Sequence, residues 1–232
     1  MLKINYGPYL KGLWPQDDSS LVANWDRARR RDAALHNPGP GPAYEGAMWE
    51  HLAIVDVETT SGNPEQGRLM EIAVVLPQAD GQVTRWHSLV RQRDPIPPFI
   101  QRLTGIRPAW LADAPPFHEL AGTFLELTEG RTLVAHNVRF DLTVLDHEFA
   151  RTGLIFQRAT LCTERLARTL LPHHQHHNLG ALCRHYGVPF TVSHRAMCDA
   201  LATLGLLQRM TTVHGMACAE QAIVPLSMQR RA

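Results

Sequence analysis

The sequence predicts an α/β domain in which a mixed central sheet is flanked by helices. Short apolar runs of strand length alternate with segments of helical periodicity between residues 52 and 212. A strand and a hairpin come first, and helices then alternate with strands. This order favours a layered domain whose sheet combines antiparallel and parallel pairs.

Four apolar runs are predicted to be strands of this sheet. Residues 52–57 are almost continuously apolar, which is typical of a central strand covered on both faces. Residues 69–76 and 83–90 are joined by the turn 79–82, so they are expected to form a hairpin. Residues 132–135 form a further short buried strand.

Helical periodicity or helix-flanking residues mark the segments between and after the strands. Leu142, Leu145 and Phe149, for example, lie at positions i, i+3 and i+7 of one helical face. The predicted helices are 116–127, 138–152, 163–170, 178–186 and 195–212.

The predicted strands and helices all lie within residues 49–215, which we expect to be the main domain. Residues 1–48 are predicted to be an N-terminal extension that ends in a linker at 37–42, where three prolines alternate with glycines and asparagine and block regular structure. Residues 216–232 are predicted to be a C-terminal tail.

Composition narrows the function classes only a little. Lys and Arg number 23 against 22 Asp and Glu, so the formal net charge of +1 creates no global basic field for nucleic acid. The four widely spaced cysteines indicate reduced thiols. Because no signal peptide and no run of ~18 apolar residues is present, we expect a cytoplasmic protein with no membrane partner.

Two carboxylates lie at the end of the first predicted strand. Asp56 and Glu58 are two positions apart, so the alternation of a strand places both on one face. Enzymes of the α/β class bind their ligands at the carboxyl ends of strands. Taken alone, the pair is more simply explained as a solvated strand end.

Two further acids and a histidine follow in comparable positions. Asp141 falls in the first turn of a predicted helix with Asn137 as its N-cap, although the helix dipole alone would explain an aspartate there. Asp199 lies in the last long helix. His194 is five residues earlier, about 140° of helical rotation away, so it must lie on the preceding loop.

The ordered set is more specific than its parts. Asp-x-Glu-Thr-Thr from Asp56, His-Asn-x-x-Phe-Asp from His136 and His-x-x-x-x-Asp from His194 resemble the three exonuclease motifs of the DEDD superfamily. The histidine is typical of one branch of that superfamily. The resemblance covers about residues 50–212 and implies a ribonuclease H-like fold.

The flanking sequences narrow the resemblance further. Residues 68–73 and 103–106 are similar to the epsilon proofreading subunits of bacterial DNA polymerase III and their relatives. Residues 49–215 are therefore expected to be an exonuclease domain. Ser61 stands where that family usually has glycine, a departure that concerns the shape of the loop beside the terminal nucleotide and not the acidic residues.

The resemblance implies catalysis by two divalent cations, Mg²⁺ or Mn²⁺, which prefer hard oxygen ligands. It implies that Asp56 bridges both ions, that Glu58 and Asp199 complete the first site, and that Asp141 serves the second. His194 is then the base that takes the proton of the attacking water, since an unperturbed imidazole pKa of about 6.5 suits that role.

The resemblance also implies a substrate, the 3′ end of single-stranded nucleic acid, with DNA favoured and nucleoside 5′-monophosphates as products. Thr59 and Thr60 are expected to contact the terminal nucleotide, and His136 and Phe140 to flank its base or sugar. Core packing explains Phe140 equally well. A role in proofreading or repair, with a DNA polymerase subunit as partner, is the implied setting.

Other functions stay open. A 3′–5′ exoribonuclease of the same superfamily would carry the same acids, because the contact that recognises a 2′-hydroxyl is not legible in one sequence. A non-catalytic polymerase-associated adaptor is disfavoured, since all five functional positions are filled. A zinc hydrolase built on the run His173, His174, His176 and His177 lacks a well-placed acid or cysteine, so a solvated loop is the favoured interpretation there.

Overall fold

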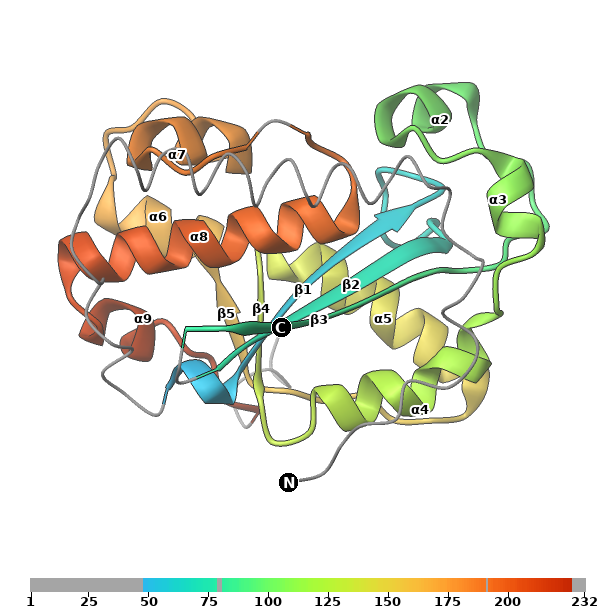
Figure 1. Ribbon diagram of the computed structural model, residues 1–232, viewed down its shortest axis with the longest axis horizontal. Coiled ribbons are helices and arrows are strands. Elements are labelled where there is room, and N and C mark those ends of the chain that lie inside the picture. The colour runs from blue at the N-terminus through green and yellow to red at the C-terminus, as the bar shows by residue number, and fades with distance from the viewer. Residues whose placement is uncertain (1–47, 79–80, 191, 227–232) are drawn as a thin grey trace. The chain divides into compact units, whose positions relative to one another are not determined.

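The computed structural model describes residues 48–78, 81–190 and 192–226 (Figure 1). The predicted N-terminal extension and its linker lie outside these residues, apart from Met48. Within the described part of the chain, no helix is both long enough and apolar enough to cross a membrane.

The described strands form one mixed sheet in the order β3-β2-β1-β4-β5. They are β1 (Leu52–Thr59), β2 (Leu69–Pro77), β3 (Val83–Leu89), β4 (Thr132–Ala135) and β5 (Thr160–Cys162). β2 pairs antiparallel with β1 and β3, whereas β4 pairs parallel with β1 and β5. The expected α/β fold with a mixed sheet is confirmed, and β1 is the central strand.

Helices cover both faces of this sheet (Figure 1). The helical elements are η2 (Trp49–His51), α2 (Pro98–Thr104), α3 (Pro108–Ala112), α4 (Phe117–Leu127), α5 (Val138–Thr152), α6 (Thr163–Leu170), α7 (Leu179–Tyr186), α8 (Ala196–His214) and α9 (Ala217–Gln221). The long helix α8 packs on β1 and β2, and α6 and α7 pack beside it.

Alternate side chains of β1 belong to different layers. Ala53 and Val55 pack with Phe124 of α4 and Phe149 of α5 in the larger core cluster. Because side chains alternate along a strand, Asp56 and its i±2 neighbours face the layer of α8 instead. Coverage on both faces explains why β1 is almost continuously apolar before its acidic end.

The short elements α2, α3 and β5 were not predicted from the sequence. With seven, five and three residues, they are too short to show a clear periodicity. A second small core of Met70, Ile96, Ile100, Ile106 and Leu111 anchors α2 and α3 to β2. Beyond α8, the chain forms α9, and Val224 then pairs with Thr160 of β5.

Candidate active site

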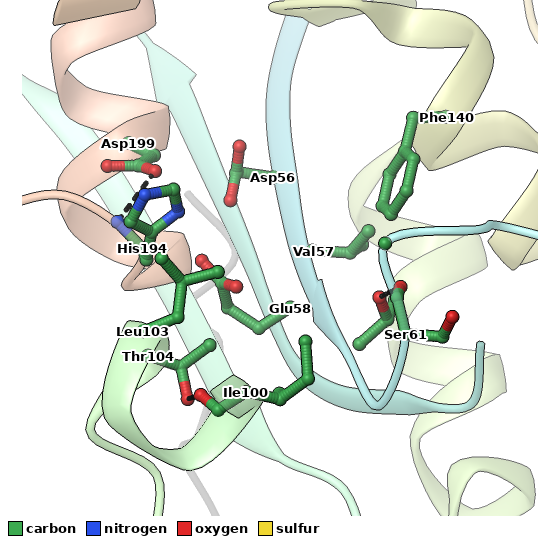
Figure 2. A pocket seen from close by; sticks show the side chains of 12 residues that line it. Asp56, Val57, Glu58, Ser61, Ile100, Leu103, Thr104, Phe140, His194 and Asp199 are labelled. Atoms are coloured by element: carbon green, nitrogen blue, oxygen red, sulfur yellow. Dashed lines mark hydrogen bonds between the residues drawn. The ribbon is translucent and has the colours of Figure 1, made fainter. Parts of the chain in front are cut away.

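The acidic pair lies where the central strand ends. Asp56 and Glu58 line a cavity of about 200 Å³ and point toward α8 (Figure 2). The pairing of β1 with β2 shifts register between Glu58 and Thr59, which marks a bulge. Because the bulge comes after both acids, strand alternation alone places Asp56 and Glu58 on one face, and the change of register affects Thr59.

The helix α8 brings a third carboxylate and the predicted histidine to the same cavity. His194 lies on the loop before α8, as predicted, and its backbone N–H donates to Asp199 Oδ2 at 3.1 Å. Ligand atoms of Glu58, His194 and Asp199 all lie within 4.8 Å of one another. Among the described His, Cys, Asp and Glu residues, this is the one group with the spacing of a metal site.

The fourth carboxylate comes from α5. Asp141 is 3% exposed and accepts a hydrogen bond from the backbone N–H of Val57. Asn137 occupies the N-cap position, as predicted, but it is left-handed (φ 67°) and its side chain makes no capping hydrogen bond. Asp141 does not line the cavity itself, yet its charge contributes to the raised pKa of Asp56.

The pKa values of the four carboxylates reflect a crowded, poorly solvated cluster. Burial is the largest cause in every case, and it raises the pKa of Asp56, Glu58 and Asp141 well above the usual range. Burial also raises the pKa of Asp199 to about 7, although the hydrogen bond from His194 N–H opposes it. These groups ionise more readily when positive charge is placed among them.

The donor set fits divalent cations. Asp199 Oδ1 is buried and has no hydrogen-bond partner among the described residues, so a hard oxygen lone pair is left available. The surrounding ligand atoms are mainly carboxylate oxygens, which Mg²⁺ and Mn²⁺ prefer, and the described residues add no cysteine to the group.

The helix α2 forms a wall of the cavity that sequence reasoning did not assign to the site. Ile100, Leu103 and Thr104 of α2 line the cavity, and Phe140 and Ser61 lie across from them (Figure 2). The only sequence signal was the family-like stretch at 103–106, which carried no role. The wall exists because the buried Ile100 fixes α2 in the small second core.

The structure divides the four residues predicted to bind substrate. Thr59 and Phe140 line the cavity, and Phe140 also packs against the larger core. Contact of Phe140 with a nucleotide stays a prediction. Thr60 is not among the lining residues, and its Oγ1 accepts from Arg68 N–H. His136 is also absent from the lining.

Both ring nitrogens of His136 form hydrogen bonds away from the cavity. Its Nε2 donates to the carbonyl of His177 at 2.9 Å, and its Nδ1 lies 3.0 Å from Thr163 Oγ1. The loop that contains His177 is therefore not simply solvated. His173 and His176 are exposed as predicted, but His177 is 8% exposed and its Nε2 donates to the Leu171 carbonyl, so that part of the interpretation was wrong.

Comparison with known proteins places this geometry in a family. The exonuclease family model (RNase_T) matches residues 53–207. The chain is 31% identical over 157 residues to the 3′-5′ exonuclease DinG of Staphylococcus epidermidis, and 33% identical over 184 residues to the DNA polymerase III PolC-type of Bacillus cereus. These matches cover 67% and 77% of this chain but only 17% and 13% of those relatives.

Solved structures share the fold. The structure of Exonuclease X in complex with 5′ overhanging duplex DNA is similar with a TM-score of 0.58 and 30% identity, over 74% of this chain and 96% of that chain. A 3′-exonuclease solved for 3′-end recognition of a histone mRNA stem-loop has a TM-score of 0.63 at 15% identity, over 82% and 71%, which shows the fold alone. Because the family model matches more than half of its length, the chain belongs to the exonuclease family, within the DEDD superfamily of 3′–5′ exonucleases.

Proposed function

We propose that this protein hydrolyses single-stranded DNA from its 3′ end, one nucleotide at a time, and releases nucleoside 5′-monophosphates. The observation that carries the proposal is the convergence of acidic residues from β1 and α8 with His194 at one cavity. Asp141 of α5 is buried close enough for its charge to raise the pKa of Asp56. The DinG relative is named as a 3′-5′ exonuclease, and Exonuclease X was solved with DNA, which favours DNA as the substrate.

The four carboxylates would hold two divalent cations, with Mg²⁺ or Mn²⁺ as the proposed ions. Asp56 and Glu58 come from β1, Asp141 from α5 and Asp199 from α8. Bound there, the cations would screen the charge of the scissile phosphate and make the attacking water more acidic. The chain's own part is to hold the carboxylates close together against their mutual repulsion.

His194 is proposed to accept the proton of the attacking water. His194 is exposed at the edge of the cavity, and the partial burial of its ring lowers its pKa below the ordinary imidazole value. The neutral ring that can accept a proton is therefore available near neutral pH. Its ring nitrogen also lies close enough to Glu58 and Asp199 to be a metal ligand. The two roles require different experiments.

The terminal nucleotide is proposed to lie between α2 and the start of α5. Leu103 and Thr104 stand on one side of the cavity, and Phe140 on the other (Figure 2). An aromatic face and an apolar side chain accept any base, which suits an enzyme that trims without regard to sequence. Thr59 Oγ1 already donates to the Ser61 carbonyl, so it shapes this wall through the loop.

Digestion of 5′-labelled oligonucleotides tests the activity. With Mg²⁺ or Mn²⁺, single-stranded DNA should shorten progressively from its 3′ end, and a chelator should abolish the reaction. Asp56→Ala should remove nearly all turnover while circular dichroism and the melting curve match the wild type, because loss of one crowded carboxylate costs the metal-free fold little. Rescue by zinc alone would contradict the two-ion proposal.

The same assay separates the other functions. Faster digestion of an RNA oligomer of equal sequence would identify an exoribonuclease, and no digestion of either strand would favour the non-catalytic adaptor. The PolC-type relative supports a DNA polymerase subunit as the proposed partner in proofreading or repair. The cytoplasmic location stays a prediction.

Calorimetry with Mn²⁺ separates the two roles of His194. A general base outside the metal sites contributes to proton transfer and not to ion affinity, so His194→Gln should lower kcat by about 10²–10⁴ and leave Mn²⁺ affinity unchanged. Asp199→Asn should weaken Mn²⁺ binding. If His194→Gln loses affinity as severely as Asp199→Asn, His194 is a ligand.

A further inference from the structure

A fifth carboxylate lies directly behind the site and has a different environment from the other four. Glu71 of β2 stands opposite Glu58 in the β1–β2 register, and its side chain is 1% exposed. Arg195 Nε donates to both of its oxygens at 3.2 Å, and Arg195 Nη2 donates to Oε1 at 3.0 Å. The backbone N–H of Ala196 donates to Oε2 at 3.0 Å.

Glu71 is held as an anion, unlike the carboxylates of the cavity. Burial acts to raise its pKa, but the hydrogen bond and charge of His87, together with Arg195, outweigh burial and lower the pKa to about 2. Both carboxylate oxygens are engaged by the arginine and by the first residue of α8. A buried ion pair with its hydrogen bonds complete is a rigid connection between two elements, and breaking one partner leaves an unpaired buried charge.

This connection joins β2 to the residue next to the proposed base. His194 has a left-handed backbone with φ 60°, which is unfavourable for a residue other than glycine and persists only when its surroundings enforce it. Two contacts enforce it here. The N–H of His194 is held by Asp199, and the following residue, Arg195, is held by Glu71.

We infer that Glu71 is a positioning residue which, through Arg195, holds the His194 ring at the cavity. The pair fixes the start of α8 against β2, so the strained residue before it has one orientation. The part that concerns turnover rests on the proposed function, because it assumes that His194 acts in the reaction. Two other roles are possible for Glu71, a further metal ligand or a purely stabilising ion pair, and each has a different experimental outcome.

Arg195→Lys is the central variant. Lysine keeps the positive charge beside Glu71 but replaces the planar, forked donor with a single point donor. We expect kcat to fall about 10- to 100-fold, as for a small misplacement of a reacting group, while KM and Mn²⁺ affinity stay within about twofold. Arg209→Lys is the matched control, because it makes the same change on α8 and also removes an Nε hydrogen bond, there to the Tyr186 carbonyl.

The decisive measurement is the coupling between Arg195 and His194. If the arginine acts through the histidine, Arg195→Lys should change kcat by no more than about twofold in a His194→Gln background. An equal loss of kcat in both backgrounds would overturn the inference and leave a stabilising ion pair. A loss of Mn²⁺ affinity in Glu71→Gln as large as in Asp199→Asn would also overturn it, because Glu71 would then be a ligand.

A readout without activity keeps the inference separate from the proposed function. The imidazole Cε1–H signal of His194, assigned by its disappearance in His194→Gln, should shift or broaden in Arg195→Lys and stay unchanged in Arg209→Lys. An unchanged signal in Arg195→Lys would refute positioning even in an active enzyme, and a shifted signal would support it even if no strand is digested. Should Arg195→Lys fail to fold, the double variant Glu71→Gln/Arg195→Gln carries the same expectations, since it removes both charges of the pair together and leaves His87 an amide as its hydrogen-bond partner.

Discussion

The two carboxylate oxygens of Asp199 have opposite surroundings. Oδ2 accepts the His194 N–H, whereas Oδ1 is buried without a hydrogen-bond partner among the described residues. A buried carboxylate in this state is costly to ionise until a cation reaches it. The metal-free fold therefore gives up stability at neutral pH in order to keep this oxygen available.

Asp199→Asn is expected to raise the melting temperature of the metal-free protein at pH 8 but not at pH 4. The pKa of Asp199 rises from 3.8 in a free side chain to about 7 in the fold, mainly through burial. The folded chain therefore keeps its proton longer than the unfolded chain. The resulting stability is fully present below pH 3.8 and is lost as pH rises through 7.

Asparagine does not ionise, so the variant escapes that loss. The test is a series of melting curves in chelator between pH 4 and pH 8, and the difference between variant and wild type should grow with pH. A difference that is constant across the series would contradict the raised pKa. Excess Mn²⁺ should reverse the order at pH 8, because it stabilises the wild type by binding.

The sequence identifies some residues of the site and misplaces others for a physical reason. Asp56, Glu58 and Asp199 reach the cavity because strand alternation and a first helical turn determine their direction locally. The direction of the His136 ring depends instead on Thr163 and the His177 carbonyl, which lie 27 and 41 positions away. Long-range contacts of that kind leave no local pattern in the sequence.

At the scale of elements, the histidine loop between α6 and α7 separates into exposed and buried positions. His173 and His176 are exposed, whereas His177 donates to the Leu171 carbonyl from a buried position. The double variant His173→Gln/His176→Gln should therefore melt like the wild type. His177→Ala should lower the free energy of unfolding by about 0.5–1.5 kcal/mol, because it removes the part-buried hydrogen bond to the Leu171 carbonyl.

Urea denaturation and the oligonucleotide assay together test this division. Catalysis should stay within a few-fold of wild type in both variants below their melting temperatures, since none of these side chains lines the cavity. Lost activity with an intact fold in the double variant would revive the zinc hypothesis. Equal stability of the two variants would contradict a stabilising role of the hydrogen bond between His177 and Leu171.

The element α2 shows where prediction from sequence stops. Its seven residues begin with a proline, have no side-chain cap, and end at Gly105, whose left-handed φ of 71° ends the helix. Ile100 belongs to one apolar cluster with Met70 of β2 and Leu111 of α3, and those partners come from other elements. The wall of the cavity therefore follows from tertiary contacts and not from helical propensity.

For the whole described domain, the type of sheet was easier to predict from the sequence than its edge strand. The predicted order of a strand, a hairpin and then alternating helices and strands indicated a mixed sheet, and the observed sheet is mixed. The third parallel strand, β5, was not predicted because its three residues are too few to show the alternation of a strand. The position of β5 is determined by its parallel pairing with residues Leu133 to Ala135 of β4.

β5 is an edge strand of the sheet, and this position affects solubility. The outer side of an edge strand offers unpaired N–H and C=O groups to any other chain, which promotes self-association. Here Val224 and Thr160 exchange two backbone hydrogen bonds of 3.0 and 2.7 Å, so the segment after α8 shields that side. We therefore expect larger species in sedimentation velocity at high concentration for two variants, a chain that ends at residue 215 and Val224→Pro in the full chain. Ile223→Ala, next to the bridge, is the control and should behave like the wild type.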